Sequence, residues 1–204
     1  MRTTRKKAAP GGRPVQAKRL NLFATPLAVC ILPESEALKA PLAALARDAA
    51  ADGDGGFADA ENAPPELACV IEAAVTLADA MEAGTAGAWA LSWRGEILQP
   101  GAGSDVESLP DALWCAHYLI DAGGGGGGTL ELQDPRGAAP VMYAPGLTFA
   151  AEGAETLGVS QSIGLKEGAL AVFPAWLLQS VALHRGPKPR LSLTVGLRRR
   201  TEAA

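Results

Sequence analysis

The sequence predicts a mainly β fold of the α+β class, in which two N-terminal helices buttress one face of an antiparallel, double-sheet jelly roll. Helix-spaced apolar residues come first, between residues 34 and 81, and from Ala86 onward the spacing becomes that of short strands. Helices and strands form separate blocks, which argues against alternating βαβ units. Hydrophobic residues make up 48% of the 204 residues and charged residues 20%, as in an ordinary globular domain.

The N-terminal segment differs in charge from the rest of the chain. Residues 1–21 hold seven basic residues and no acidic residue, whereas the remaining chain holds 11 basic and 22 acidic residues. Pro and Gly interrupt the basic segment, so we expect a disordered tail over residues 1–21, a single domain over 22–198 and a short tail over 199–204. The acidic domain gives no reason to expect a nucleic-acid partner.

The first ordered element is expected to be a buried strand within residues 22–32 (LFATPLAVCIL). Its basic flank gives it a superficial likeness to a secretory signal, but Pro26 interrupts the run and no small-residue cleavage site follows. No run approaches the roughly 18 apolar residues of a membrane span. We therefore expect a cytoplasmic protein without a membrane segment.

Two helices follow this strand. Residues 34–51 are rich in Ala and Leu at helical spacing, and a loop over 52–65 leads to a helix that opens at Pro64-Pro65 and ends at Gly84. The apolar face of this second helix consists of Leu67, Val70, Ile71, Ala74, Leu77, Ala78 and Met81. Because that face carries no reactive group, we expect it to pack on a sheet.

Seven strand-like runs make up the second part of the chain. They span residues 88–95, 113–121, 129–134, 159–165, 169–174, 176–183 and 190–197. Six consecutive glycines, 123–128, separate two of these runs. A phosphate-binding loop would lead into a helix and carry a Lys, whereas here a strand follows, so we interpret the glycines as a flexible hairpin connection.

The small number of His and Cys residues limits the metal sites that the chain could form. Two His and three Cys residues exclude a site with three imidazoles and a four-cysteine zinc site. Cys30, Cys69 and Cys115 are far apart and form no C-x-x-C motif, so we expect reduced thiols that serve in packing.

Several strings, taken in order, resemble the 2-oxoglutarate- and iron(II)-dependent oxygenases of bacteria and phages. The matching strings are LFATPLAVCIL, AWALSWRGE, LPDALWCAHYLID, LQDPRG, LKEGALAVFPAWL and PRLSLTV. FPAWL and DPR are fairly specific, and the likeness extends from Leu22 to about Leu197. It implies a double-stranded β-helix, the jelly roll of that family, with Fe(II) and 2-oxoglutarate as cofactors.

The resemblance also assigns positions to the metal ligands, and this chain departs from the pattern at all of them. In the family an H-x-H or H-x-D motif and a distal His hold the iron. Alignment on Pro110 and Trp114 places the first two ligands at Glu107 and Leu109, and the distal ligand, eleven residues before Arg190, at Gln179. Leu cannot bind any metal, so the standard iron triad is absent and we expect no metal at these positions.

The resemblance also includes the carboxylate-binding motif of the family, which corresponds to Arg190 and Ser192 in this chain. In the family this R-x-S motif binds the distal carboxylate of 2-oxoglutarate, and a guanidinium suits that task because it pairs bidentately with carboxylates. The alternative is an Arg at the start of a strand, paired with an acid of this acidic protein. Lys188 and Arg185 lie nearby and could also bind an anion.

Two other arrangements remain open. Asp105 and Glu107 would share a strand face and, with His184, could form an oxygen-rich metal site. His184 falls in a Gly- and Pro-containing loop, where most histidines are solvated. His117 falls in an apolar strand, where a lone His is more often a hydrogen-bonded core residue than a ligand. We expect Trp114, Tyr118 and Trp176 to be core or pocket-wall residues.

The favoured hypothesis is a diverged oxygenase-like protein without the iron triad, a pseudoenzyme that binds a small carboxylate or a protein partner. An active oxygenase (hydroxylase) with a non-standard metal site is the first alternative. The second is a jelly-roll interaction module that dimerises through a sheet face. Oligomeric state stays open, although exposed sheet edges in jelly rolls often pair. The sequence leaves open whether the protein is an enzyme, because fold alone does not decide activity.

Overall fold

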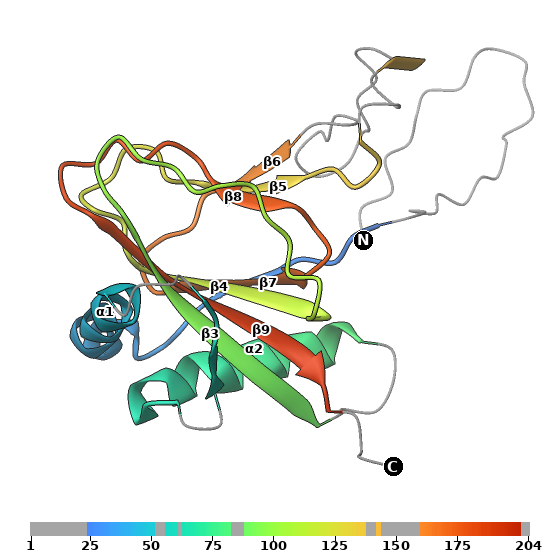
Figure 1. The fold of residues 1–204 in the computed structure, drawn as a ribbon, viewed down its shortest axis with the longest axis horizontal. Coiled ribbons are helices and arrows are strands. Elements are labelled where there is room, and N and C mark those ends of the chain that lie inside the picture. The colour runs from blue at the N-terminus through green and yellow to red at the C-terminus, as the bar shows by residue number, and fades with distance from the viewer. Residues whose placement is uncertain are drawn as a thin grey trace, which may run out of the picture.

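A computed structural model describes residues 24–51, 56–60, 63–82, 88–137, 142–143 and 160–200, and its strands form two antiparallel sheets (Figure 1). The six-stranded sheet has the order β1-β7-β4-β9-β3-β2. Its strands are β1 (Ala28–Ile31), β7 (Ala169–Pro174), β4 (Trp114–Asp121), β9 (Arg190–Arg199), β3 (Trp89–Leu98) and β2 (Ala58–Asp59). The three-stranded sheet has the order β6 (Ser160–Ile163), β5 (Leu130–Gln133) and β8 (Gln179–Val181).

Both helices cover the face of the six-stranded sheet that points away from the three-stranded sheet, which confirms the predicted buttressing (Figure 1). Helix α1 is Ser35–Ala51, and α2 is Ala68–Met81, preceded by the 3₁₀ turn η2, Pro65–Leu67. Alanine faces on both helices allow close approach to the sheet. The buried helix residues are Leu42, Ala43, Ala46, Val70, Ala74 and Ala78. None of the described helices is long and apolar enough to span a membrane.

Strand β9 lies between β4 and β3 and shows how the two faces of the large sheet differ. Successive side chains of a strand point to opposite faces. The odd-numbered residues from Leu191 to Leu197 belong to the apolar cluster beneath the helices. The even-numbered residues, Arg190, Ser192, Thr194 and Gly196, therefore face the interior between the two sheets. One face of the strand builds the core, and the other is free to build a polar site.

Gly95 allows α1 to approach β3 closely. A Cβ atom on Gly95 would lie 2.8 Å from the Cα atom of Ala46 and 2.8 Å from its carbonyl oxygen. These atoms belong to a helix backbone that is held by its own hydrogen bonds, so they cannot move aside easily. Position 95 therefore accepts only glycine without a shift of the helix.

The glycine run 123–128 is not a hairpin connection, contrary to the sequence interpretation. It joins β4 of the large sheet to β5 of the small sheet, so it crosses between the layers. All six glycines have positive φ, between 67° and 89°, a region that other residues seldom adopt. The run packs along residues 183–188, where the Gly126 carbonyl accepts a hydrogen bond of 2.6 Å from the Arg185 amide.

At the two ends of the domain, the structure differs from the expected strand boundaries. The first strand is shorter than residues 22–32 and lies at the sheet edge, with Val29 51% and Ile31 56% exposed, so it is not fully buried. Strand β9 extends through Arg199, one residue past the predicted boundary. The expected tail over residues 1–21 lies outside the described residues, as do residues 201–204 of the expected C-terminal tail.

Replacing Gly95 by Ala should lower the free energy of unfolding by about 1–3 kcal/mol, the usual penalty for overpacking a close contact. Chemical denaturation of both proteins would measure the change. Gly164→Ala is the matched control, because a Cβ atom there meets nothing within 4 Å. Equal stabilities of the two variants would contradict the role given to Gly95.

Candidate functional site

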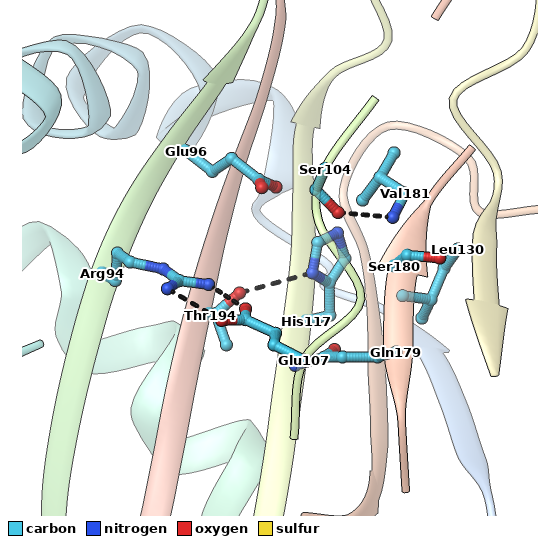
Figure 2. A pocket seen from close by; sticks show the side chains of 10 residues that line it. All are labelled: Arg94, Glu96, Ser104, Glu107, His117, Leu130, Gln179, Ser180, Val181 and Thr194. Carbon is cyan, nitrogen blue, oxygen red and sulfur yellow. Dashed lines mark hydrogen bonds and ion pairs between the residues drawn. The ribbon is translucent and has the colours of Figure 1, made fainter. Parts of the chain in front are cut away.

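Polar side chains line a small cleft between the two sheets (Figure 2). They come from β3, β4, β8 and β9 and from the segment that precedes β4. The lining residues are Arg94, Glu96, Ser104, Glu107, His117, Leu130, Gln179, Ser180, Val181 and Thr194. The enclosed volume is about 10 Å³, which is room for one water molecule.

Two of the three metal-ligand positions that the resemblance assigned meet at this cleft. Glu107 and Gln179 pair through their backbones, with N–O distances of 2.9 and 2.8 Å. The third position, Leu109, is 8% exposed and belongs to an apolar cluster with Cys115 and Phe173. The backbone therefore brings Glu107 and Gln179 together, while Leu109 lies in an apolar cluster.

The Glu107 carboxylate forms a bidentate ion pair with Arg94 (Figure 2). The Arg94 guanidinium also stacks on the Phe57 ring, 4.8 Å from its centroid. Desolvation lowers the pKa of Arg94, but the hydrogen bond and charge of Glu107 outweigh it, and the pKa rises overall. A protein cation thus neutralises the one carboxylate among the assigned positions.

Gln179 and Cys115 form a second local pair. The Gln179 amide nitrogen lies 3.4 Å from the Cys115 sulfur, and the amide oxygen lies 3.7 Å from the same atom. Burial raises the pKa of the Cys115 thiol to about 12, although the bond to Gln179 opposes this shift. The sulfur is therefore a protonated thiol at neutral pH, which is a poor metal ligand.

Arg190 is almost fully buried beside the cleft, with 1% of its surface exposed. Its Nε donates to the Gly128 carbonyl at 3.0 Å, its Nη1 donates to Ser192 Oγ at 2.9 Å, and its Nη2 lies 3.1 Å from His117 Nε2. Burial lowers the pKa of Arg190, and the Glu96 charge opposes this shift. The hydrogen bond between Arg190 and Ser192 brings together the two residues that the resemblance assigns to carboxylate binding.

His117 is buried between Arg190 and Thr194. Because the arginine can only donate, His117 Nε2 is the acceptor, and the protonated Nδ1 faces Thr194 Oγ1 at 3.4 Å. Burial, together with the charges of Arg190 and Arg94, holds the pKa of His117 well below its usual value. His117 is therefore neutral at physiological pH.

The oxygen-rich metal site considered from the sequence is not assembled. Asp105 is exposed, Glu107 is paired with Arg94, and His184 is buried in the glycine loop with Nε2 2.6 Å from the Lys188 carbonyl. Across the described ranges, no three His, Cys, Asp or Glu side chains form a group that could hold a metal ion. The expectation of a solvated His184 is also wrong, because the glycine loop covers the ring.

The other residues of interest divide between core and surface. Trp114 and Tyr118 belong to the core, as expected, whereas Trp176 is 55% exposed and is neither core nor pocket wall. Arg185 and Lys188 lie at the exposed surface. Neither of these two lines the cleft.

Arg94 and Glu96 are the site residues that sequence reasoning missed. They stand two apart in a strand and so share the face that looks into the cleft (Figure 2). Their spacing could have indicated a polar strand face. It could not indicate their partners, because Glu107 follows a loop after β3 and Ser192 belongs to a strand that pairs with β3 only in the folded sheet.

Comparisons with known proteins identify the fold. No protein-family profile matches the chain, and neither does any curated protein. A prolyl-4-hydroxylase from Pseudomonas putida superposes with a TM-score of 0.59 at 20% identity, covering 88% of this chain and 91% of that one. AviO1 from Streptomyces viridochromogenes Tue57 gives 0.56 at 13% identity, over 88% and 92% of the two chains.

A third structure of similar size gives the same result. SnoN, described as a non-heme α-ketoglutarate-dependent epimerase from nogalamycin biosynthesis, has a TM-score of 0.53 at 13% identity, over 86% of this chain and 77% of its own. Together with the two sheets and the position of the cleft between them, these similarities confirm the predicted jelly roll. The chain has the double-stranded β-helix fold of the 2-oxoglutarate- and iron(II)-dependent oxygenases.

Proposed function

We propose that the protein is a pseudoenzyme with the oxygenase fold, which does not perform iron-dependent oxygenation and binds a small carboxylate at Arg190. The observation that carries the proposal is the state of Arg190, a buried cation whose direct hydrogen-bond partners are all uncharged. Burying a charge without a direct counter-ion lowers the stability of the folded state by several kcal/mol. A carboxylate ligand would give Arg190 a direct counter-ion in place of the indirect contact through a neutral group.

The donors of Arg190 suit this role. A guanidinium has five N–H groups, and the bonds to Gly128, Ser192 and His117 use three of them. The remaining donors lie on the two Nη atoms, which can bind a carboxylate. Since the cleft has a volume of about 10 Å³, a ligand must displace lining side chains as it binds.

Iron does not fit the donor set. Fe(II) in this type of site requires two imidazoles and a carboxylate, or a close variant, with open positions for 2-oxoglutarate and O2. Here the corresponding positions hold a carboxylate bound by Arg94, an apolar leucine, and an amide bound to Cys115. The residues therefore support carboxylate binding by Arg190 without a metal.

His117 contributes by remaining uncharged. As an acceptor, its Nε2 holds one edge of the Arg190 guanidinium, and the positive charge stays on the arginine. Protonation of His117 would remove this acceptor and place two cations 3.1 Å apart. The site is therefore arranged for neutral and alkaline pH.

A second candidate function is self-association through β1. This strand lies at the edge of the large sheet, and Leu27, Val29 and Ile31 are 39%, 51% and 56% exposed. An apolar edge strand can pair with the same strand of a second copy. The occupant proposed for this edge is a second copy of the chain.

Carboxylate binding should be measurable as ligand-dependent stability. At ten times Kd, butyrate or glutarate should raise the free energy of unfolding by about 1.4 kcal/mol, and Arg190→Ala should abolish the effect. Circular dichroism would verify that the variant is folded. Arg185→Ala and Lys188→Ala are matched controls. Loss of the stabilisation in either variant would show that the carboxylate binds at the exposed surface rather than at Arg190.

The metal part of the proposal has its own test. Neither Fe(II) nor Mn(II) should raise the unfolding temperature, and 2-oxoglutarate should not be converted to succinate in their presence. Stoichiometric iron that is lost on Glu107→Gln substitution would overturn the pseudoenzyme proposal.

Stability should fall in acid because of His117. The unfolded chain takes up a proton near pH 6.5, whereas folded His117 does so only at much lower pH, so the unfolded state binds more protons below that value. Because of this residue, the free energy of unfolding should decrease by about 1.4 kcal/mol for each unit by which the pH falls. In His117→Gln the slope of stability against pH between 6 and 5 should decrease by that amount, and an unchanged slope would refute the assignment.

Self-association predicts a concentration-dependent dimer in light scattering. Ile31→Lys should shift it to monomer, whereas Val106→Lys, at another exposed apolar position, should not. A wild-type protein that is monomeric at high micromolar concentration would eliminate this second candidate.

A further inference from the structure

The charge of Arg190 is balanced indirectly, by Glu96 acting through Ser192. Arg190 Nη1 donates to Ser192 Oγ at 2.9 Å, and Ser192 Oγ donates to Glu96 Oε2 at 3.1 Å. Glu96 stands on β3 and Arg190 at the start of β9, and the pairing of these two strands brings them together. A carboxylate of the protein therefore lies one hydroxyl away from the proposed ligand anchor.

The charges around the cleft sum to zero. Arg94 balances Glu107 directly, Arg190 balances Glu96 through Ser192, and His117 is neutral. All these groups line the cleft or contact a residue that does. A dianionic ligand would bring two negative charges into a neutral, partly buried space that already holds two carboxylates, and this is unfavourable where the dielectric constant is low.

The two glutamates differ in what they can still bind. Both oxygens of Glu107 are held by Arg94. Glu96 accepts a hydrogen bond only from the neutral Ser192 hydroxyl among the described residues, so its Oε1 is available to a donor. Figure 2 shows the Glu96 carboxylate directed toward the interior from the same strand face as Arg94. A cationic ligand group would find its partner here.

We infer that the cleft selects a zwitterionic amino carboxylate over a dicarboxylate, and that Glu96 is the residue that determines this specificity. The carboxylate of the ligand pairs with Arg190 and its ammonium group pairs with Glu96, so the bound state stays neutral and each charge has a direct partner. This inference rests on the proposed carboxylate site at Arg190. It adds the chemical class of the ligand to that site.

Three ligands that share the butyrate skeleton and differ only in the substituent on C4 test the inference. In 4-aminobutyrate the end opposite the carboxylate is an ammonium group, in butyrate it is a methyl group, and in glutarate it is a second carboxylate. Calorimetric titration of the wild-type protein should give the affinity order 4-aminobutyrate, butyrate, glutarate, with about tenfold or more between the first and the last, in line with the usual discrimination by one buried charge pair.

Glu96→Gln should reverse the preference. The glutamine keeps the shape of the side chain and can still accept a hydrogen bond from Ser192. The affinity for 4-aminobutyrate should therefore fall about tenfold, and the affinity for glutarate should rise. Glu131→Gln, a charge change on β5 outside the cleft lining, is the matched control and should leave the order unchanged. The ratio of the two affinities is the readout, because it does not depend on the overall stability of the variant.

The outcomes separate this inference from the proposed function. Tighter binding of glutarate by the wild-type protein, or an affinity ratio that Glu96→Gln does not change, overturns the specificity inference while the Arg190 site stands. If none of the three ligands binds, the carboxylate site is absent and both proposals fall.

Discussion

The two-residue period of the central strands is the constraint on which the rest of the structure depends. In β9, leucines and valine alternate with Arg190, Ser192, Thr194 and Gly196, so one face must lie under the helices while the other faces the cleft. The same alternation in β4 sends Tyr118 to the core and His117 to the polar side. A slip of one residue in either strand would bury the polar set in the core and expose the apolar set.

Charge compensation explains how the polar side chains between the two sheets are stabilised. At the cleft between the sheets this chain has an arginine beside a carboxylate and an amide beside a thiol. Each group finds its partner within the protein, which avoids the penalty of buried, unpaired polar atoms. The buried Arg190 is the exception, because its nearest carboxylate is Glu96 on the far side of Ser192. This lack of a direct counter-ion is the feature from which the proposed ligand site follows.

Local patterns predicted the elements well, and they failed where long-range pairing decides. Helix α1 and strands β4 and β7 begin and end within a residue or so of the expected bounds, because their apolar spacing is strong and their ends carry turn residues. The glycine run 123–128 was misread as a hairpin because nothing local shows that β4 and β5 belong to different sheets. The same loop covers His184, which composition had placed in solvent.

The sequence by itself determined the order of helices and strands, the likeness to the oxygenases, and which residue types stand at Glu107, Leu109 and Gln179. These follow from residue type and spacing along the chain. Only the tertiary structure decided that Arg94 binds Glu107 and that Glu96 reaches Arg190 through Ser192. The physical reason is that the meeting of Glu96 with Ser192 depends on the register of β3 and β9, and that of Arg94 with Glu107 on the path of the segment after β3, neither of which one-dimensional patterns contain.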